Sequence, residues 1–75
     1  MAKAVYHEEE LPAFELNRLA IVLKEEKKNN RYLATELGYA ENTVSSWTRN
    51  AFQPSLYTFY RIALLLNRDL PDLFA

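Results

Sequence analysis

Apolar residues recur along this chain at helical spacing, and nowhere do they alternate as in a half-buried strand. The first series stands at i, i+3, i+4 and i+7 and comprises Leu16, Leu19, Ala20 and Leu23. Pro12 suits the first turn of a helix, and Lys27 would lie near the negative end of the helix dipole. The pattern therefore predicts a first helix over residues 12–27.

A shorter second helix is predicted over residues 31–37. It follows Asn29 and Asn30, which are poor residues inside a helix but good ones at its cap. Its buried side chains are expected to be Leu33, Ala34 and Leu37. Gly38 ends this helix, because glycine adopts the left-handed backbone of a helix exit without a steric penalty.

A third helix is predicted to begin near Glu41, after a tight turn. Val44 and Trp47 stand three positions apart and mark the buried side of this helix. Asn50 tolerates the left-handed conformation that would close it.

A fourth helix is predicted after Ser55, a natural cap, and is expected to end near Asn67. Its apolar face comprises Leu56, Phe59, Ala63 and Leu66. Asp69 can cap a last short turn over residues 70–74. The apolar residues of this turn must either dock on the core or meet a partner, and they are Leu70, Leu73 and Phe74.

The composition is that of one small helical domain. Of 75 residues, 49% are apolar and one is glycine, which favours packed helices over disorder. There is no cysteine and a single histidine, His7, so we expect no disulfide, no metal site and no cofactor. No apolar run approaches the roughly 18–20 residues of a membrane span, and no signal peptide is recognisable, so a cytoplasmic location is expected.

Charge is unevenly distributed, although the net charge is only −1. Residues 1–16 carry −3 and residues 69–75 carry −2, whereas residues 17–68 carry +4. We divide the chain into an acidic tail, residues 1–11, and a helical domain, residues 12–75. The positive middle could face phosphates or could be an ordinary mixed surface, and charge alone does not separate the two.

The spacing of residues 30–49 predicts a helix-turn-helix. Two helices that cross within one short turn need a small residue where they touch, a glycine in the turn and bulky apolar residues that hold the second helix. The residues that meet these needs in register are Ala34, Gly38, Val44 and Trp47. In such a motif the second helix enters the major groove of DNA.

The outward face of the third helix is polar. A step of about 100° per residue places this set opposite the buried side: Asn42, Ser45, Ser46 and Arg49. We predict base contacts from Glu41 to cytosine N4, from Asn42 to adenine N6 and N7, and from Ser46. A polar face alone would indicate a solvated surface, and the crossed-helix spacing is what favours DNA.

Phosphate contacts are predicted at the N-terminus of the second helix and around the third helix and its exit. The residues expected to make them are Asn30, Arg31, Thr43, Arg49, Gln53 and Ser55. These contacts would set affinity and register, whereas the base contacts would set sequence preference.

Over residues 17–74 the chain resembles the Cro and lambda-repressor-like regulators of bacteria and phages, also called the XRE family. The resemblance includes Leu33-Ala34, Leu37-Gly38, Thr43-Val44-Ser45, Trp47, Pro54-Ser55-Leu56, Ile62-Ala63 and Leu70-Pro71-Asp72-Leu73-Phe74. It implies an all-α, five-helix lambda-repressor-like DNA-binding domain whose third helix reads DNA. It also implies that positions 41, 42 and 46 face bases and that positions near 30, 43, 49, 53 and 55 face the backbone.

The leading hypothesis is a transcriptional regulator, with a repressor favoured, that binds a palindromic operator on double-stranded DNA as a homodimer. Possible dimer contacts are Phe52, Leu70, Leu73 and Phe74. Packing under its loop is the favoured role of Phe52, while Tyr57 and Tyr60 could be partial core or interface.

Two alternatives use the same fold. One is an antitoxin that also covers a toxin protein. The other is a protein-interaction module that has lost DNA binding, an alternative favoured by Glu41 and by the aromatic residues that have no assigned role. An enzyme is not expected. The sole histidine lies in the tail, there is no glycine-rich phosphate loop, and Ser45 and Ser46 have no nearby general base.

Overall fold

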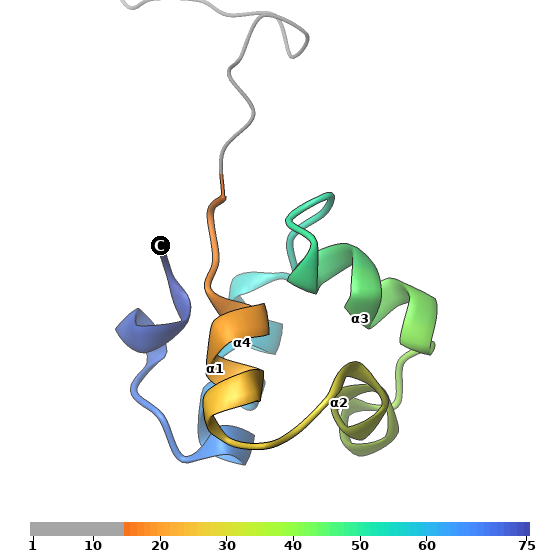
Figure 1. Ribbon diagram of the computed structural model, residues 1–75, viewed down its shortest axis with the longest axis horizontal. Coiled ribbons are helices and arrows are strands. Elements are labelled where there is room, and N and C mark those ends of the chain that lie inside the picture. The colour runs from red at the N-terminus through yellow and green to blue at the C-terminus, as the bar shows by residue number, and fades with distance from the viewer. Residues whose placement is uncertain (1–14) are drawn as a thin grey trace, which may run out of the picture.

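The computed structural model describes residues 15–75, and the predicted acidic tail and Pro12 lie outside this range. The described chain forms four α-helices and a final 3-10 helix, which confirms the all-helical prediction (Figure 1). The elements are α1 (Leu19–Glu25), α2 (Asn30–Leu37), α3 (Glu41–Thr48), α4 (Leu56–Leu66) and η2 (Leu70–Leu73). Helix η2 stands where a fifth helix was expected. None of these helices has the length and apolar character that crossing a bilayer would need.

The first helix is shorter than predicted, because residues 16–18 pair with the C-terminal segment instead of coiling. The pairing consists of Arg18 N–H to the Leu73 carbonyl at 2.8 Å, Ala75 N–H to the Leu16 carbonyl at 3.0 Å and an antiparallel Asn17–Phe74 bridge. Helix α1 therefore begins at Leu19 and not at Pro12. Leu16, which was expected on the buried face, is exposed.

The C-terminus of α1 is held by an arginine from beyond α4. The helix ends at Glu25, earlier than the predicted Lys27, which has a left-handed φ of 58°. Arg68 Nη2 lies 3.1 Å from Glu25 Oε1 and 2.7 Å from Glu26 Oε2. The hydrogen bond to Glu26, followed by that to Glu25, raises the pKa of Arg68 above its ordinary value.

Local capping signals account for the boundaries of α2 and α3. Asn29 caps α2, because its Oδ1 accepts a hydrogen bond from the Tyr32 N–H at 2.9 Å. Gly38 ends α2 with a left-handed φ of 79°. Ala40 precedes α3 in an extended conformation and supplies no side-chain cap. Asn50 has the predicted left-handed conformation, with φ of 58°.

Helix α4 begins and ends where the sequence predicted, but its buried face differs at one position. Ser55 Oγ accepts a hydrogen bond from the Thr58 N–H, and Asn67 ends the helix with φ of 55°. Leu56 was expected in the core and is 66% exposed. The buried face instead centres on Phe59, Ile62, Ala63 and Leu66, and Leu56, in the first turn, lies at the edge of the opposite face.

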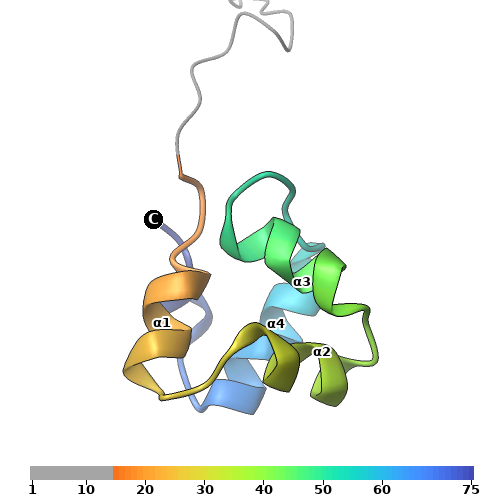
Figure 2. The same ribbon diagram turned by 45° about the vertical axis from the view of Figure 1, so that its right-hand side comes forward.

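One apolar core joins all five elements. Helix α2 packs mainly against α3, and η2 contacts both α1 and α4 (Figures 1 and 2). Fully buried side chains come from every element and include Leu19, Leu33, Val44, Ile62 and Leu73. The C-terminal turn thus docks on the core, which was one of the two arrangements predicted for its apolar residues. Asp69 stands at the cap position of η2, but its side chain makes no capping hydrogen bond.

Candidate nucleic-acid interface

Helices α2 and α3 form a crossed pair held by the residues predicted for this role. Ala34, Val44 and Trp47 are buried, and the left-handed Gly38 lies in the turn between the helices. The Trp47 ring meets Tyr39 edge to face, with 5.0 Å between ring centroids. Because one side of α3 is anchored in this way, its opposite side is presented to solvent.

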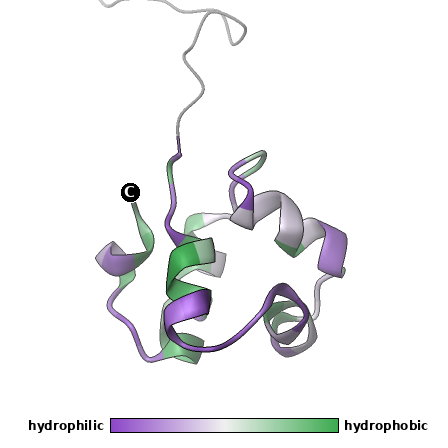
Figure 3. Ribbon diagram, in the orientation of Figure 1, coloured by the Kyte–Doolittle hydropathy of each residue, from purple (hydrophilic) through white to green (hydrophobic). Residues whose placement is uncertain are grey.

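The outward side of α3 begins with strongly hydrophilic residues, as Figure 3 shows. Glu41 and Asn42 are exposed, whereas Ser46 is half-buried. The Ser46 hydroxyl donates to the Thr43 carbonyl at 2.6 Å, so its oxygen remains available as an acceptor. Within residues 15–75 no hydrogen bond engages the Asn42 amide, which leaves both its donor and its acceptor free for a base edge.

Glu41 is paired with one of the residues predicted to contact phosphate. Its Oε2 lies 3.6 Å from Arg31 Nε, at the edge where α2 and α3 both begin. Both side chains are more than half exposed, so this ion pair contributes at most about 1 kcal/mol and breaks easily. The guanidinium of Arg31 can therefore exchange the carboxylate for a phosphate.

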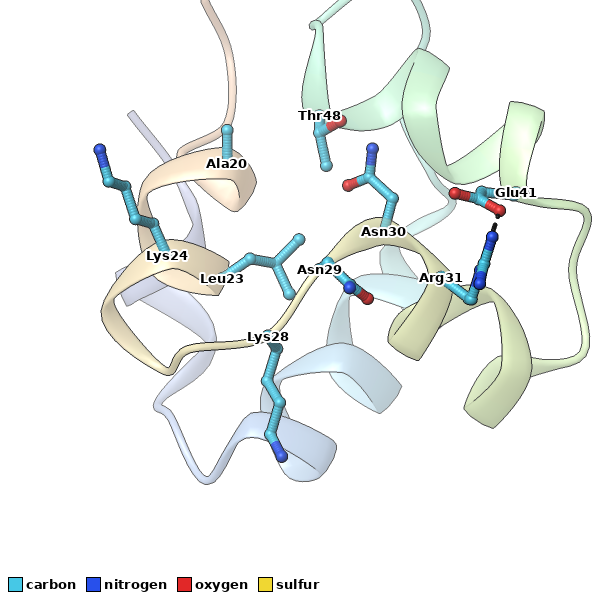
Figure 4. A pocket seen from close by; sticks show the side chains of 9 residues that line it. All are labelled: Ala20, Leu23, Lys24, Lys28, Asn29, Asn30, Arg31, Glu41 and Thr48. Carbon is cyan, nitrogen blue, oxygen red and sulfur yellow. Dashed lines mark ion pairs between the residues drawn. The ribbon is translucent and has the colours of Figure 1, made fainter.

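An open groove of about 530 Å³ lies between α1, the start of α2 and α3 (Figure 4). Its lining residues are Ala20, Leu23, Lys24, Lys28, Asn29, Asn30, Arg31, Glu41 and Thr48. Figure 4 shows Asn30 and Thr48 near each other inside the groove, with Lys24 and Lys28 on its rim and their side chains directed outward on different sides. We call this feature the basic groove.

The two rim lysines were missed as site residues by the sequence analysis. Lys24 had no assigned site role, and Lys28 follows the end of the predicted first helix. The structure brings both to the N-terminus of α2, and Lys28 Nζ also lies 4.5 Å from the centroid of the Tyr32 ring. The signal was present in the sequence as four basic residues between positions 24 and 31, but only the turn from α1 into α2 brings three of them, Lys24, Lys28 and Arg31, to the same groove.

Gln53 and Ser55, two of the predicted phosphate contacts, make hydrogen bonds within the chain. Gln53 Oε1 accepts from Asn17 Nδ2 at 2.6 Å, and Gln53 Nε2 donates to Asn50 Oδ1 at 3.1 Å. Ser55 Oγ caps α4. The Gln53 amide thus holds the loop after α3 through its oxygen and one N–H, while the second N–H of Nε2 is left for the predicted phosphate contact, which stays a prediction. Arg49 remains exposed, with Nε 3.4 Å from Ser45 Oγ.

Asn17 organises these hydrogen bonds and was not identified from the sequence. It is 2% exposed, and its Nδ2 also donates to the Trp47 carbonyl at 3.0 Å. Its Oδ1 accepts from the Leu19 N–H at 2.9 Å. Its own N–H donates to Asn50 Oδ1 at 2.9 Å. This amide cluster, formed by Asn17, Asn50 and Gln53, fixes the end of α3 against the segment that enters α1.

Comparison with known proteins agrees with this arrangement. A helix-turn-helix family model, HTH_3, matches residues 19–73. A crystal structure from Bacteroides fragilis, described as that of a candidate DNA-binding protein, is similar with a TM-score of 0.80 and 44% sequence identity. The similarity covers 83% of this chain and 100% of that chain. Among curated proteins, none matches the sequence.

Proposed function

We propose that this chain, which belongs to the HTH_3 helix-turn-helix family of Cro- and lambda-repressor-like proteins, binds double-stranded DNA with α3 in the major groove. One observation carries the proposal. Trp47 and Val44 anchor one side of α3 in the core, while Asn42 on the other side is exposed and its amide makes no hydrogen bond with any residue from 15 to 75. The similar protein from Bacteroides fragilis, described as a candidate DNA-binding protein, supports it.

In this proposal sequence preference comes from the first turns of α3. Asn42 offers a donor and an acceptor in the geometry that matches adenine N6 and N7. Glu41 accepts from cytosine N4 once its ion pair with Arg31 opens, and Ser46 contributes an acceptor. Asn42 is therefore the main determinant of specificity.

Phosphate binding in this proposal uses the basic groove and the C-terminal end of α3. Arg31 and Asn30 lie at the N-terminus of α2, where unpaired N–H groups favour an anion. Lys24 and Lys28 add positive charge on the rim of the groove. Thr43, which stands between Asn42 and Ser46, and Arg49, at the end of α3, contact the phosphate backbone.

The proposed biological role is regulation of transcription, with repression favoured, by a homodimer on a palindromic operator. The chain is proposed to act without catalysis or cofactor. A second candidate role, in which the domain also binds another protein as antitoxins do, is favoured by one observation. Tyr57, Tyr60 and Leu64 are apolar or aromatic and are all at least half exposed on α4.

The salt dependence of binding tests the proposal most directly. A 20-base-pair duplex of random sequence is expected to bind with a log Kd that rises linearly with log salt concentration, because each neutralised phosphate releases counterions. With about four to six phosphate contacts, affinity should fall roughly 100-fold or more between 50 and 200 mM salt. A measurement by fluorescence anisotropy checks this. A salt-independent signal, or no binding at low salt, would contradict the proposal and favour a protein-interaction module.

Separate roles are expected for Asn42 and Arg49. Asn42→Ala should cost about 1–3 kcal/mol of discrimination at one base pair, whereas Arg49→Ala should weaken binding to all sequences alike. Selection of bound duplexes from a random pool, followed by titration of the selected site and of single-base variants, measures both effects. An equal loss from both substitutions with unchanged sequence preference would remove this assignment of roles.

A further inference from the structure

The outward face of α4 is apolar and has no partner among the described residues. Four side chains share this face and are between 51% and 71% exposed, namely Leu56, Tyr57, Tyr60 and Leu64. At about 100° per residue Tyr57 and Leu64 lie opposite the buried Phe59, Ile62 and Leu66. Tyr60 lies beside them, and Leu56 lies at the edge of this face. None of the four is charged. We call this set the α4 stripe.

The α4 stripe exposes enough apolar surface for a modest interface. Taking about 200 Å² for a tyrosine, the exposed parts of the four side chains amount to roughly 450 Å². Patches of about 300–600 Å² on monomers are often functional. Two copies joined through the stripe would remove roughly 900 Å² from water before flanking residues are counted, which is close to the lower limit of about 1,000 Å² for a specific interface.

The order of residues makes the α4 stripe complementary to itself. Tyr57 and Leu64 lie at equal distances from the point midway between Tyr60 and Arg61. A two-fold axis at that point, with the two helices antiparallel, sets Tyr57 of each copy opposite Leu64 of the other. The same axis sets Tyr60 opposite Arg61, where a guanidinium can stack on a ring.

A shallow groove lies where the opposing Tyr57 would arrive. It is lined by residues of α2 and α4, has a volume of about 340 Å³, and comprises Glu36, Leu37, Arg61, Leu64 and Leu65. Arg61 Nη2 lies 3.5 Å from the Leu37 carbonyl oxygen at this place. Tyr57 is 71% exposed, so its ring is free to enter such a groove, and its hydroxyl would find the Glu36 carboxylate there as an acceptor.

We infer that a second copy of this chain docks on the α4 stripe, as an antiparallel pair of α4 helices with Tyr57 of each copy in the groove of the other. The inference deepens the proposed function by naming the surface through which the homodimer forms. Dimer formation itself does not depend on DNA binding, and only the use of the dimer on an operator rests on the proposed function. It differs from the dimer contacts predicted from the sequence, of which Leu73 is fully buried in its own subunit and is not available to a partner. Phe52 is 71% exposed, which contradicts the packing role predicted for it, but it lies outside the stripe.

The oligomeric state without DNA tests the inference. Sedimentation equilibrium of the full chain from 1 to 500 µM is expected to show a reversible dimer, and Leu64→Glu should weaken it about 100-fold or more, because each interface would bury two carboxylates in place of apolar side chains. Phe52→Glu is the matched control and should leave the dimer unchanged. A wild-type chain that stays monomeric throughout, or a dimer that Leu64→Glu does not weaken, would overturn the inference. Circular dichroism verifies that each variant is folded.

Cysteine pairing gives a second test that does not depend on a disruptive charge. The chain has no cysteine of its own, so introduced thiols report only their own proximity. An equimolar mixture of Tyr57→Cys and Leu64→Cys proteins should oxidise to a covalent dimer. This reaction should be at least about 10-fold faster than in a control mixture of Phe52→Cys and Leu64→Cys proteins, because a disulfide requires Cα atoms within about 7 Å. Equal rates in the two mixtures would overturn the antiparallel arrangement. Because neither test contains DNA, failure here leaves the proposed DNA binding to be judged by its own salt titration.

Discussion

Replacement of Trp47 by alanine is expected to lower the free energy of unfolding by about 3–5 kcal/mol. Trp47 is 5% exposed and meets Tyr39 edge to face, so its loss removes a large buried side chain and leaves a cavity between α3 and the rest of the core. A domain of this size is stabilised by only about 4–11 kcal/mol in total. The variant should therefore be partly or wholly unfolded at 37 °C.

Urea unfolding followed by circular dichroism measures this loss, because the helical signal does not depend on the tryptophan itself. Phe52→Ala is the matched control: it removes an aromatic side chain that is 71% exposed and should change stability by no more than about 0.5 kcal/mol. If Trp47→Ala and Phe52→Ala cost the same, Trp47 does not anchor α3. DNA binding should fall in parallel with the folded fraction of Trp47→Ala.

The second large effect is expected from Asn17→Ala, at about 2–3 kcal/mol of unfolding free energy. The substitution removes the donor to the Trp47 carbonyl and to Gln53 Oε1, and it leaves the Leu19 N–H without its acceptor. Buried polar groups that lose a partner cost more than the average hydrogen bond contributes. Since Asn17 is 2% exposed, water does not easily replace the lost bonds.

Asn29→Ala is the control for Asn17→Ala, because it measures the stability cost of losing a single helix cap outside the amide cluster. Asn29 caps α2 through one exposed hydrogen bond, so its replacement should cost only about 1 kcal/mol. A double-mutant cycle between Asn17→Ala and Gln53→Ala should give a coupling energy of about 0.5 kcal/mol or more, measured by urea unfolding. Additive losses, or a cost for Asn17→Ala no greater than that for Asn29→Ala, would show that the amide cluster does not act as a unit.

The amide cluster also bears on DNA binding, because it determines where α3 ends relative to α1. Asn17 holds the Trp47 carbonyl, and Asn50 accepts the N–H groups that lead into α1. Arg49, the proposed phosphate contact, lies between these two anchors in the chain. The position of Arg49 therefore depends on contacts with residues more than 30 positions away in the sequence.

Local signals in the sequence determined most of the helices and the crossed pair. Glycine at position 38, asparagines at 50 and 67 and the cap at Ser55 all act within one helical turn, and the structure uses them as predicted. The three-residue spacing of Val44 and Trp47 likewise places both on the buried side of α3. These signals sufficed because capping and side-chain periodicity depend on neighbours no more than about four residues apart.

Tertiary structure alone decided the rest. Four features depend on segments that are distant in the sequence or on how the helices are oriented against one another. They are the start of α1, the hydrogen bonds of Gln53 within the chain, the exposure of Leu56 and the position of Lys24 and Lys28 in the groove beside α2. Residues 16–18 continue a helical pattern, yet their backbone pairs with the C-terminus, more than 50 residues away. The physical reason is that hydrogen bonds formed on closing such a long loop outweigh a weak local helical preference, and no pattern within one helical turn records them.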